Sequence, residues 1–499
     1  MAETIEINRN TRRVPFGKGM HLRAPGLRAR LTWRAPEEHA ALMPTGVAPS
    51  ADPVERALAE AGLQDEGSLN IDEEQPSADG GPADKIVVGT TIAPGRVQFA
   101  IHRDPSGVLS LHRPLPVVPQ AAIAPPGTTP ATHHYVIPLR KAPATAANAP
   151  HTAMLGGIAG RVVRFVGRKV LGVVGDVVFE AAKLWENKYR AAQGFHGGAN
   201  ATQLLQDPPL PVADFGPLNG NPSLLFIHGT TSSTAGAFIG LLGFAAAAGN
   251  LYTEYGNRVI GFNHHTLTKS VPQNAVDFYA GLPAGNYQFD VISHSRGGLL
   301  ARALKELPPD ELAQLASAAN AQPGVNVEIG KILLVGTPDV GTPLADPTDL
   351  PKAVSRLASI ASSFSADVAT LGLGAFFAIF GGIVEGGIGS LPGLEDMNPG
   401  NPFLTQLNGA APNNADYYGI EADYQPSGGL AKAIENNGVD ALFLGEQNDL
   451  IVPTLGVSTV NGQALPAGQV NDYPPPQDVY HLNYFRQQNT WDKICGFLI

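Results

Sequence analysis

Cysteine is almost absent from this chain of 499 residues. Its single cysteine, Cys495, excludes an intramolecular disulfide framework and a cysteine-rich metal site. Charge is scarce too, because charged residues make up 15% of the sequence against about 25% in typical globular proteins. The 33 basic and 44 acidic residues give a net charge of −11. This balance argues against a general nucleic-acid-binding protein.

Signals for targeting and for membrane spanning are also lacking. Residues 1–8 have neither a basic start nor an apolar core, so we expect no classical secretory leader. The cytoplasm is then the default compartment, and export without a cleaved leader stays open. The apolar stretch 370–384 is interrupted by glycines and is shorter than the roughly 20 residues of a transmembrane helix.

Glycine and proline, by contrast, are abundant. The 57 glycines and 43 prolines together exceed the usual share of about 12%, which is typical of a loop-rich body with long connectors. The hydrophobic content of 43% is ample for a packed core, and the length favours two or more domains.

The most informative segment surrounds Ser295. An apolar, strand-like run from Phe289 ends in Ser293-His294-Ser295-Arg296-Gly297, and a helix-like stretch over 299–307 follows. A serine at a strand–turn–helix junction with small neighbours on either side is typical of a nucleophile elbow, usually written G-x-S-x-G. Ser293 departs from this pattern, since it replaces the first glycine. A serine-rich surface turn is the alternative interpretation.

Two later segments supply the partners that a serine nucleophile needs. Asp449 follows the apolar run 441–444, where a carboxylate can orient an imidazole, although it can also simply cap its own loop. Glu446 and Asp440 are rival acids. His481 lies near the C-terminus and can act as the general base. The order Ser295, Asp449, His481 is the chain order of α/β-hydrolases, and it differs from those of chymotrypsin and subtilisin.

On these motifs the chain from about Pro222 onward resembles the α/β-hydrolase superfamily, and within it the serine lipases and esterases. Further support comes from the Gly-Thr-Pro loop at 336–346 and from the segment 392–408, which looks like the one that bacterial lipases carry after their lid. The resemblance implies an oxyanion hole formed by the backbone N–H groups of Thr230, after the strand ending in His228-Gly229, and of Arg296.

The same resemblance bears on cofactors and partners. We expect no organic cofactor. Some related lipases hold a structural calcium ion, for which Asp346, Asp472 and Asp478 are acids of a suitable kind. The expected substrate is a small-molecule or lipid ester, and nucleic acid is not expected as a partner. Transient contact with a membrane or lipid surface, and a protein partner bound through the N-terminal module, are further hypotheses.

The pattern along the chain predicts three zones. Residues 1–145 form a β-rich module that contains a helix over 53–63, an acidic linker after it and a hairpin over 96–112. In the same module His133-His134 is interpreted as part of a solvated loop. Residues 146–215 form a connection with a long amphipathic helix over 157–190. Residues 216–499 form the hydrolase domain with a lid or cap insertion at about 348–410.

The expected fold class of the last zone is α/β, a doubly wound and mostly parallel sheet preceded by the smaller β-rich module. The candidate strands are 223–228, 258–263, 288–294, 330–336 and 440–446. Two interpretations of 370–384 stay open, a mobile lid and a buried helix pair of the cap.

The predicted function is a serine carboxylic-ester hydrolase of the lipase or esterase type. It would work through Ser295, His481 and Asp449 and an acyl-enzyme intermediate, and the expected substrates are lipid or hydrophobic esters. Two alternatives stay open: an acyltransferase with the same triad, and a non-catalytic interaction protein with a hydrolase fold.

Overall fold

A computed structural model gives the structure of the protein. It describes residues 3–7, 13–17, 19–24, 27–36, 53–75, 85–104, 109–116, 131–138, 160–173, 175–318, 324–346, 350–363, 373–386, 390–409, 414–425, 447–475 and 477–499. The chain divides into two compact units. The first comprises Met1–Trp185, Val354–Gly389 and Ser427–Asn437, and the second comprises Glu186–Ala353, Ser390–Pro426 and Gly438–Ile499.

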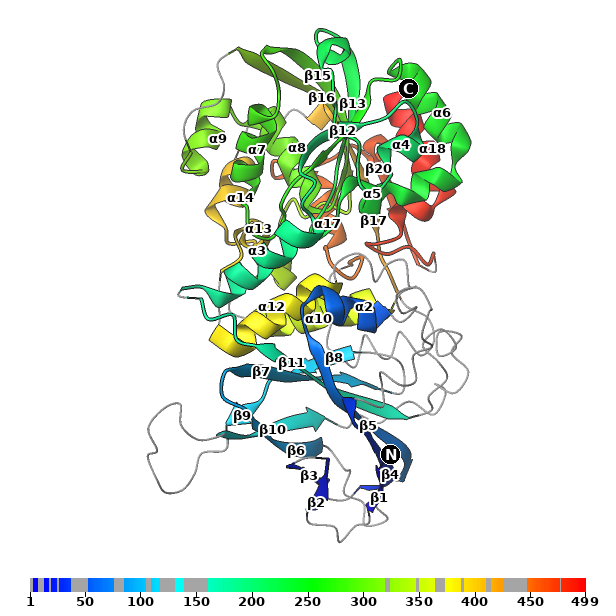
Figure 1. Ribbon diagram of the computed structural model, residues 1–499. Coiled ribbons are helices and arrows are strands. Elements are labelled where there is room, and N and C mark those ends of the chain that lie inside the picture. Colours follow the sequence, from blue (N-terminus) through cyan, green and yellow to red (C-terminus); the bar gives the residue numbers. More distant parts are fainter. Residues whose placement is uncertain are drawn as a thin grey trace. The chain divides into compact units, whose positions relative to one another are not determined.

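The first unit contains two antiparallel sheets (Figure 1). In the described residues one sheet has the order β1-β4-β5-β11-β7-β8 and the other β2-β3-β6-β10-β9. The strands are β1 (Glu3–Ile7), β2 (Val14–Phe16), β3 (Met20–Arg23), β4 (Arg28–Arg34), β5 (Gln64–Gln75), β6 (Lys85–Ile92), β7 (Arg96–Arg103), β8 (Leu109–His112), β9 (Leu115–Pro116), β10 (Ala131–Pro138) and β11 (Arg161–Lys169). Their inward side chains form one shared core, which holds the two sheets face to face.

Strand β11 corrects the prediction of a long helix over 157–190. Residues 161–169 pair with β5 on one side and with β7 on the other. Arg161, Val163 and Phe165 are buried, whereas Val162 and Arg164 between them are only half-buried. This alternation has the period of a strand, and β-branched valines pack well in sheets. In the sequence Val162, Val166 and Val170 recur at every fourth position, a spacing typical of a helix, but the helix α3 spans only Val177–Tyr189.

The acidic linker is also a strand. Asp65 and Glu66 lie in β5, where Glu66 accepts hydrogen bonds from Arg96 and Gln98. Asp65 forms an ion pair with Arg164 of β11. Acidic residues are depleted in strands, and here partners on the neighbouring strands satisfy the carboxylates. The sequence pattern within one segment does not contain this information.

The structure tests two local predictions for the first unit, the hairpin over 96–112 and the loop at His133-His134. β7 and β8 pair antiparallel, which confirms the hairpin, although its turn at 105–108 lies outside the described residues. His133 and His134 lie in β10, paired with β6, so their interpretation as a solvated loop is wrong. Both histidines are half-buried, because their main chains pair with Thr90 and Gly89 and extend the strand ahead of the apolar run 135–137.

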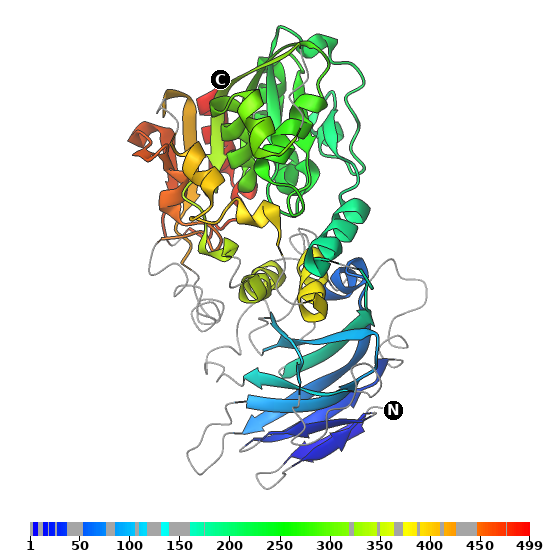
Figure 2. The ribbon, with the colours of Figure 1, turned by 90° about the vertical axis from the view of Figure 1, so that its left-hand side faces the viewer.

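Helices α2 (Pro53–Glu60) and α12 (Leu373–Gly386) belong to this unit, as does α10 (Leu350–Ser363) from Val354 onward. α12 lies beside α2 (Figure 2) and contacts both α2 and β7. The ring of Phe380 on α12 meets that of Phe99 on β7 edge-on, with centroids 5.2 Å apart. Residues 373–383 are all buried. The described part of the predicted lid is therefore a packed helix of the first unit, closer to the buried alternative, and residues 370–372 lie outside the described chain.

The second unit contains a sheet with the order β12-β14-β13-β15-β16-β17-β20 in the described residues. Its strands are β12 (Gly194–Gly197), β13 (Pro222–Ile227), β14 (Val259–Asn263), β15 (Gly285–His294), β16 (Val325–Val335), β17 (Tyr417–Ala422) and β20 (Val470–Tyr473). All neighbouring pairs are parallel except β12–β14. This is the mostly parallel sheet that the sequence predicts.

Helices cover both faces of this sheet. Figure 1 shows α7 (Val271–Ala280), α8 (Arg296–Glu306) and α9 (Pro309–Leu315) on one side and α4 (Ala201–Leu204), α6 (Ala245–Glu254) and α18 (Gln488–Leu498) on the other. The shorter elements are η3 (Gly216–Leu218), α5 (Thr234–Phe238), η4 (Ile239–Gly243), η5 (Pro343–Ala345), α13 (Pro392–Glu395), α14 (Pro402–Leu407), η7 (Asn414–Asp416), α17 (Thr454–Val457), β18 (Thr459–Val460), β19 (Gln463–Ala464), η8 (Ala467–Gln469) and η9 (Tyr484–Arg486).

Four of the five predicted strands correspond to β13, β14, β15 and β16. The fifth, 440–446, lies outside the described residues, as do the rival acids Asp440 and Glu446. β17 and β20 were not predicted. Both contain polar residues and are short, so neither shows the continuous apolar run of a fully buried strand.

No single helix in the described ranges has the length and apolar character needed to cross a membrane. One bent pair, Thr234–Gly243 with Ala245–Glu254, passes the same test when its two members are taken together across a bend of 113°.

The alternation in β11 gives a test of the first unit. Phe165→Ala removes a fully buried ring that contacts Trp33 and Tyr135, and we expect it to lower the free energy of unfolding by about 3–5 kcal/mol. Val162→Ala, on the same strand but half-buried, should cost far less. Urea titration followed by circular dichroism measures both, and equal losses would contradict the strand assignment.

Candidate active site

Ser295 occupies the sharp junction between β15 and α8. Its backbone has φ 54° and ψ −133°, a conformation that non-glycine residues rarely adopt. Such a residue costs on the order of 1–3 kcal/mol and persists only where its surroundings hold it. Here the Ser295 N–H donates to the carbonyl of Val335 at 2.8 Å, and the Ser295 carbonyl accepts from Gly298 N–H at 2.9 Å. The strained turn predicted from the sequence is present.

Close backbone packing explains the small residues around this turn. A Cβ on Gly297 would lie 2.5 Å from the carbonyl oxygen of Ile227, and one on Gly229 would lie 2.7 Å from Cβ of Ser295. Ser293 takes the position of the missing glycine. Its buried hydroxyl donates to the carbonyl of Leu333 on β16 at 2.6 Å. The departure from G-x-S-x-G is therefore accommodated by one hydrogen bond.

The structure brings Ser295, His481 and Asp449 together from three distant parts of the chain. The Ser295 hydroxyl lies 2.9 Å from Nε2 of His481, and Nδ1 of His481 lies 2.8 Å from Oδ2 of Asp449. Their exposed fractions are 4%, 3% and 1%. With Nδ1 donating to the carboxylate, Nε2 is free to accept the serine proton. This is the hydrogen-bonded series that a serine nucleophile requires.

The carboxylate of Asp449 accepts four hydrogen bonds. Oδ1 accepts from the N–H groups of Ile451 at 3.1 Å and Val452 at 2.8 Å, and Oδ2 accepts from His481 and from the hydroxyl of Tyr484 at 2.9 Å. Both interpretations of Asp449 thus hold at once, because one oxygen caps its own loop and the other contacts the imidazole. The carboxylate has the partners that a buried charge needs.

Gly336, at the end of β16, makes room for these three side chains. Its φ is +58°, and a Cβ there would lie 3.0 Å from Tyr484 Cε2 and 3.1 Å from both Asp449 Oδ2 and His481 Nδ1. A side chain at this position would meet both the conformational cost of positive φ and the crowded carboxylate. This glycine belongs to the Gly-Thr-Pro loop, whose spacing the sequence showed but whose role it did not.

The two residues predicted to supply oxyanion donors, Thr230 and Arg296, belong to the two segments that meet at Ser295. Arg296 is the first residue of α8, and N–H groups in the first turn of a helix have no intrahelical acceptor. Thr230 follows Gly229, and its hydroxyl contacts Sδ of Met397 at 3.9 Å. The positive end of the α8 dipole favours negative charge at this point.

The side chain of Arg296 is itself fully buried. Its guanidinium donates to the carbonyls of Gly393 at 2.8 Å and Lys269 at 2.7 Å and pairs with Asp396 at 3.2 Å. Burial lowers the pKa of Arg296 against the opposing effect of Asp396, and burial likewise raises the pKa of Asp396. The residue after Ser295 thus ties two separate loops to the turn.

Several histidines around the turn are buried and neutral. The N–H of His264 donates to Nε2 of His228, whose Nδ1 donates to the carbonyl of Gly229. His294 donates from Nε2 to the carbonyl of His481 at 2.9 Å. Burial lowers the pKa of His228 and of His294 to about 3, and that of His196 to about 4. Sequence reasoning missed these supports, as it missed Tyr484 three residues after His481.

The sequence profile of DUF7379, described as a domain of unknown function, matches residues 199–499, which is more than half of the chain. The chain belongs to this family. Among curated proteins none matches it.

Solved structures with a related arrangement include three bacterial proteins. A lipase from Bacillus licheniformis in its mature form has 16% identity and a TM-score of 0.31, covering 58% of this chain and 95% of its own. Lipase 1 from Pelosinus fermentans has 15% identity and a TM-score of 0.34, with coverages of 56% and 97%. EstA from Clostridium botulinum has 14% identity and a TM-score of 0.34, with coverages of 65% and 98%.

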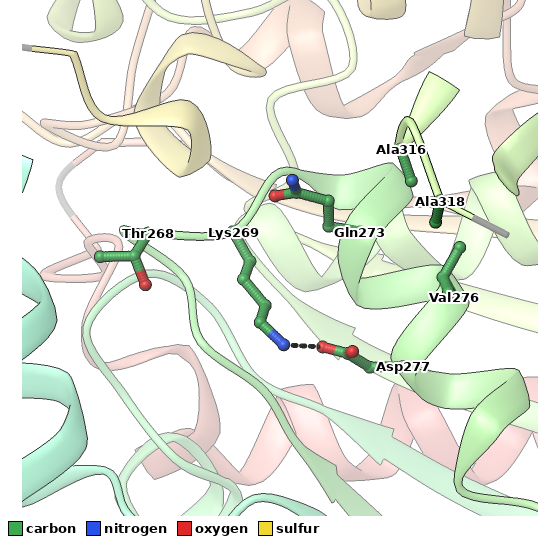
Figure 3. A pocket seen from close by; sticks show the side chains of 7 residues that line it. All are labelled: Thr268, Lys269, Gln273, Val276, Asp277, Ala316 and Ala318. Carbon is green, nitrogen blue, oxygen red and sulfur yellow. Dashed lines mark hydrogen bonds and ion pairs between the residues drawn. The ribbon is translucent and has the colours of Figure 1, made fainter. Parts of the chain in front are cut away.

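A pocket of about 320 Å³ opens beside α7 of this DUF7379 protein. Figure 3 shows its lining, in which Nζ of Lys269 pairs with Asp277 at 2.6 Å. The other lining residues are Thr268, Gln273, Val276, Ala316 and Ala318. None of Ser295, His481 and Asp449 lines it. Its link to the turn is the Lys269 carbonyl, which accepts from Arg296.

Within the described ranges, no group of three or more His, Cys, Asp or Glu side chains has an arrangement suited to a metal ion. Asp346, Asp472 and Asp478, the acids considered for calcium, belong to no such group.

The buried histidines predict acid sensitivity. The unfolded chain protonates them below about pH 6.5, whereas the folded protein keeps His228, His294 and His196 neutral until about pH 3–4. The contribution of these histidines to the free energy of unfolding is therefore fully present above pH 6.5. It falls as the pH drops, by about 1.4 kcal/mol per pH unit for each histidine. Urea midpoints between pH 7.5 and about pH 4.5 measure this slope. His294→Gln should make this slope smaller by the share of one histidine, about 1.4 kcal/mol per pH unit. A free energy of unfolding that does not change with pH would contradict the burial of the three histidines.

The crowding at Gly336 predicts a second effect on stability. Gly336→Ala and Gly462→Ala both place a side chain at positive φ, but nothing lies within 4 Å of the Cβ at Gly462. We expect Gly462→Ala to cost about 1–2 kcal/mol and Gly336→Ala clearly more, because three side chains must move. Thermal unfolding of both variants measures the difference, and equal losses would exclude crowding at the carboxylate.

Proposed function

We propose that this chain is a serine carboxylic-ester hydrolase of the α/β-hydrolase type. The observation that carries the proposal is the series of contacts from Ser295 Oγ to His481 Nε2 at 2.9 Å and from Nδ1 to Asp449 at 2.8 Å. Its support is the position of Ser295 on a strained turn between a central parallel strand and a helix.

In the proposed first step, Oγ of Ser295 attacks the ester carbonyl carbon while its proton moves to Nε2 of His481. Asp449 stabilises the imidazolium that forms. The N–H groups of Thr230 and Arg296 bind the oxyanion of the tetrahedral intermediate. The C–O bond to the alcohol then breaks, and Nε2 returns the proton to the departing oxygen, which leaves an acyl-enzyme.

In the second step, His481 removes a proton from a water molecule that attacks the acyl carbon. The second tetrahedral intermediate collapses, the carboxylic acid leaves and Ser295 regains its proton. The neutral histidines around the turn favour this chemistry, because they provide hydrogen bonds without adding a competing charge or a second strong base.

An apolar acyl group is the proposed substrate feature. The segment from Gly229 to Thr253, which starts beside Ser295, contains no charged residue, and Met397 contacts Thr230. A segment without charges that begins next to Ser295 favours an apolar acyl group over a charged one. Compartment, protein partners and contact with a lipid surface stay hypotheses from the sequence.

The central test is hydrolysis of p-nitrophenyl butyrate and laurate by wild type and Ser295→Ala. We expect kcat to fall by at least about a thousandfold in the variant, because the nucleophile is lost. Ser223→Ala is the matched control, since it also removes a buried serine hydroxyl, one that donates to the carbonyl of Asn221. It should keep turnover. Hydrolysis retained in folded Ser295→Ala would overturn the assignment.

The same assay addresses the alternative of acyl transfer. Addition of a primary alcohol would then yield an ester product in preference to the free acid, whereas a hydrolase yields mostly acid. Absence of any reaction at Ser295 in folded wild type would favour the non-catalytic alternative.

A further inference from the structure

We infer that Tyr484 is a positioning residue that sets how strongly Asp449 binds the proton on His481, and so sets the pH range in which Ser295 is reactive. The inference rests on the proposed function. Nothing in the sequence motifs assigns a role to this tyrosine.

The geometry places the phenol in direct competition with the imidazole. The Tyr484 hydroxyl donates to Oδ2 of Asp449 at 2.9 Å, and Nδ1 of His481 donates to the same oxygen at 2.8 Å. The other oxygen already accepts two backbone N–H groups. A donor to Oδ2 withdraws negative charge from the atom that faces the imidazole, which makes the imidazolium less stable.

Tyr484 is fixed in this position. Its side chain is 1% exposed, and its ring lies against Gly336, where an added Cβ would be 3.0 Å from Cε2. Only two residues separate it from His481, so one short segment provides both groups. Burial and the nearby carboxylate raise the pKa of Tyr484 well above its usual value. The phenol therefore stays a donor over the whole pH range of interest.

Other ionisable groups surround this pair. His294 packs its ring 4.9 Å from that of His481 and is neutral, and Glu421 on β17 acts on both Asp449 and Tyr484. Burial raises the pKa of Glu421 to about 7. Because Glu421 can titrate in the same pH range as the reaction, the test must leave the Glu421 side chain unchanged and remove only the hydroxyl of Tyr484.

Tyr484→Phe does this, and the chain offers a matched control. Tyr473 is 2% exposed, its hydroxyl lies 2.7 Å from Oγ1 of Thr490, and its ring lies 6.4 Å from that of Tyr484. Tyr473→Phe therefore also removes a buried hydroxyl nearby. It keeps all four hydrogen bonds to Asp449 and does not change the side chain of Glu421.

The experiment measures the rate at which a fluorophosphonate probe labels Ser295 from about pH 5.5 to 9 in wild type and both variants. Without the phenol, Asp449 holds the imidazolium more strongly, so the acid limb of the Tyr484→Phe profile should move up by on the order of half a pH unit. The Tyr473→Phe profile should coincide with that of wild type. With an ester substrate on this acid limb, Tyr484→Phe should lower kcat by up to about threefold, because more of the base is protonated, and it should leave KM and the plateau rate unchanged.

The outcomes distinguish a failure of the inference about Tyr484 from a failure of the proposed function. Labelling of Ser295 in all three proteins, with coincident acid limbs for wild type and Tyr484→Phe, overturns the inference and keeps the proposed function. A limb displaced equally in both variants also overturns it, because loss of either hydroxyl would then act through general loosening. Absence of labelling at Ser295 in folded wild type contradicts the proposed function itself.

Discussion

The left-handed backbone of Ser295 is the constraint on which the candidate site depends. It turns the chain from β15 into α8 within one residue, and two hydrogen bonds, to Val335 and from Gly298, hold it there. Because the turn is so tight, the neighbouring strand ends approach to distances that only glycine tolerates at 229 and 297. The same approach brings the ends of β13, β15 and β16 together, where Asp449, His481 and Tyr484 then meet Gly336.

Around this turn the charged groups are buried in sets with many partners. Asp449 has four donors, and Arg296 has two carbonyls and a carboxylate. Farther along α8, Arg302 is fully buried and binds Asp339, Asn408 and Asn461. Burial raises the pKa of Asp339 to about 7 in spite of this arginine. A buried charge that loses one partner is strongly destabilised, so these sets fix the loops around the turn in one arrangement.

The sequence was most informative where chemistry and local geometry coincide. Ser295 could be found because an elbow needs a strand, small residues and a helix in direct succession, and the order of Asp449 and His481 then narrowed the partners. The four strands with long apolar runs were predictable for the same local reason. Tyr484 was not, because a tyrosine carries no positional signal until the structure shows its hydroxyl on Asp449.

The errors arose where partners distant in sequence decide. The arginines of β11 and the acids of β5 were predicted to lie in a helix and in a linker. Their partners lie on other elements, since Arg164 pairs with Asp65 of β5 and Glu66 pairs with Arg96 of β7. The sequence left a lid and a buried helix pair open for the apolar segment around Phe380, because nothing local revealed its partner Phe99, some 280 residues earlier. For segments of this kind, the sequence periodicity alone indicates the wrong type of element, because contacts with distant residues decide the structure.

The insertion of Val354–Gly389 into the first unit also has a consequence for synthesis of the chain on the ribosome. α12 covers β7 and α2, yet it is translated only after β13, β14, β15 and β16 of the second unit. The ring of Phe99 and its neighbours on β7 must therefore wait for a late segment, although domains usually complete their folding in order of synthesis. Nascent chains stalled before residue 373 would leave this apolar face of β7 without its cover by α12.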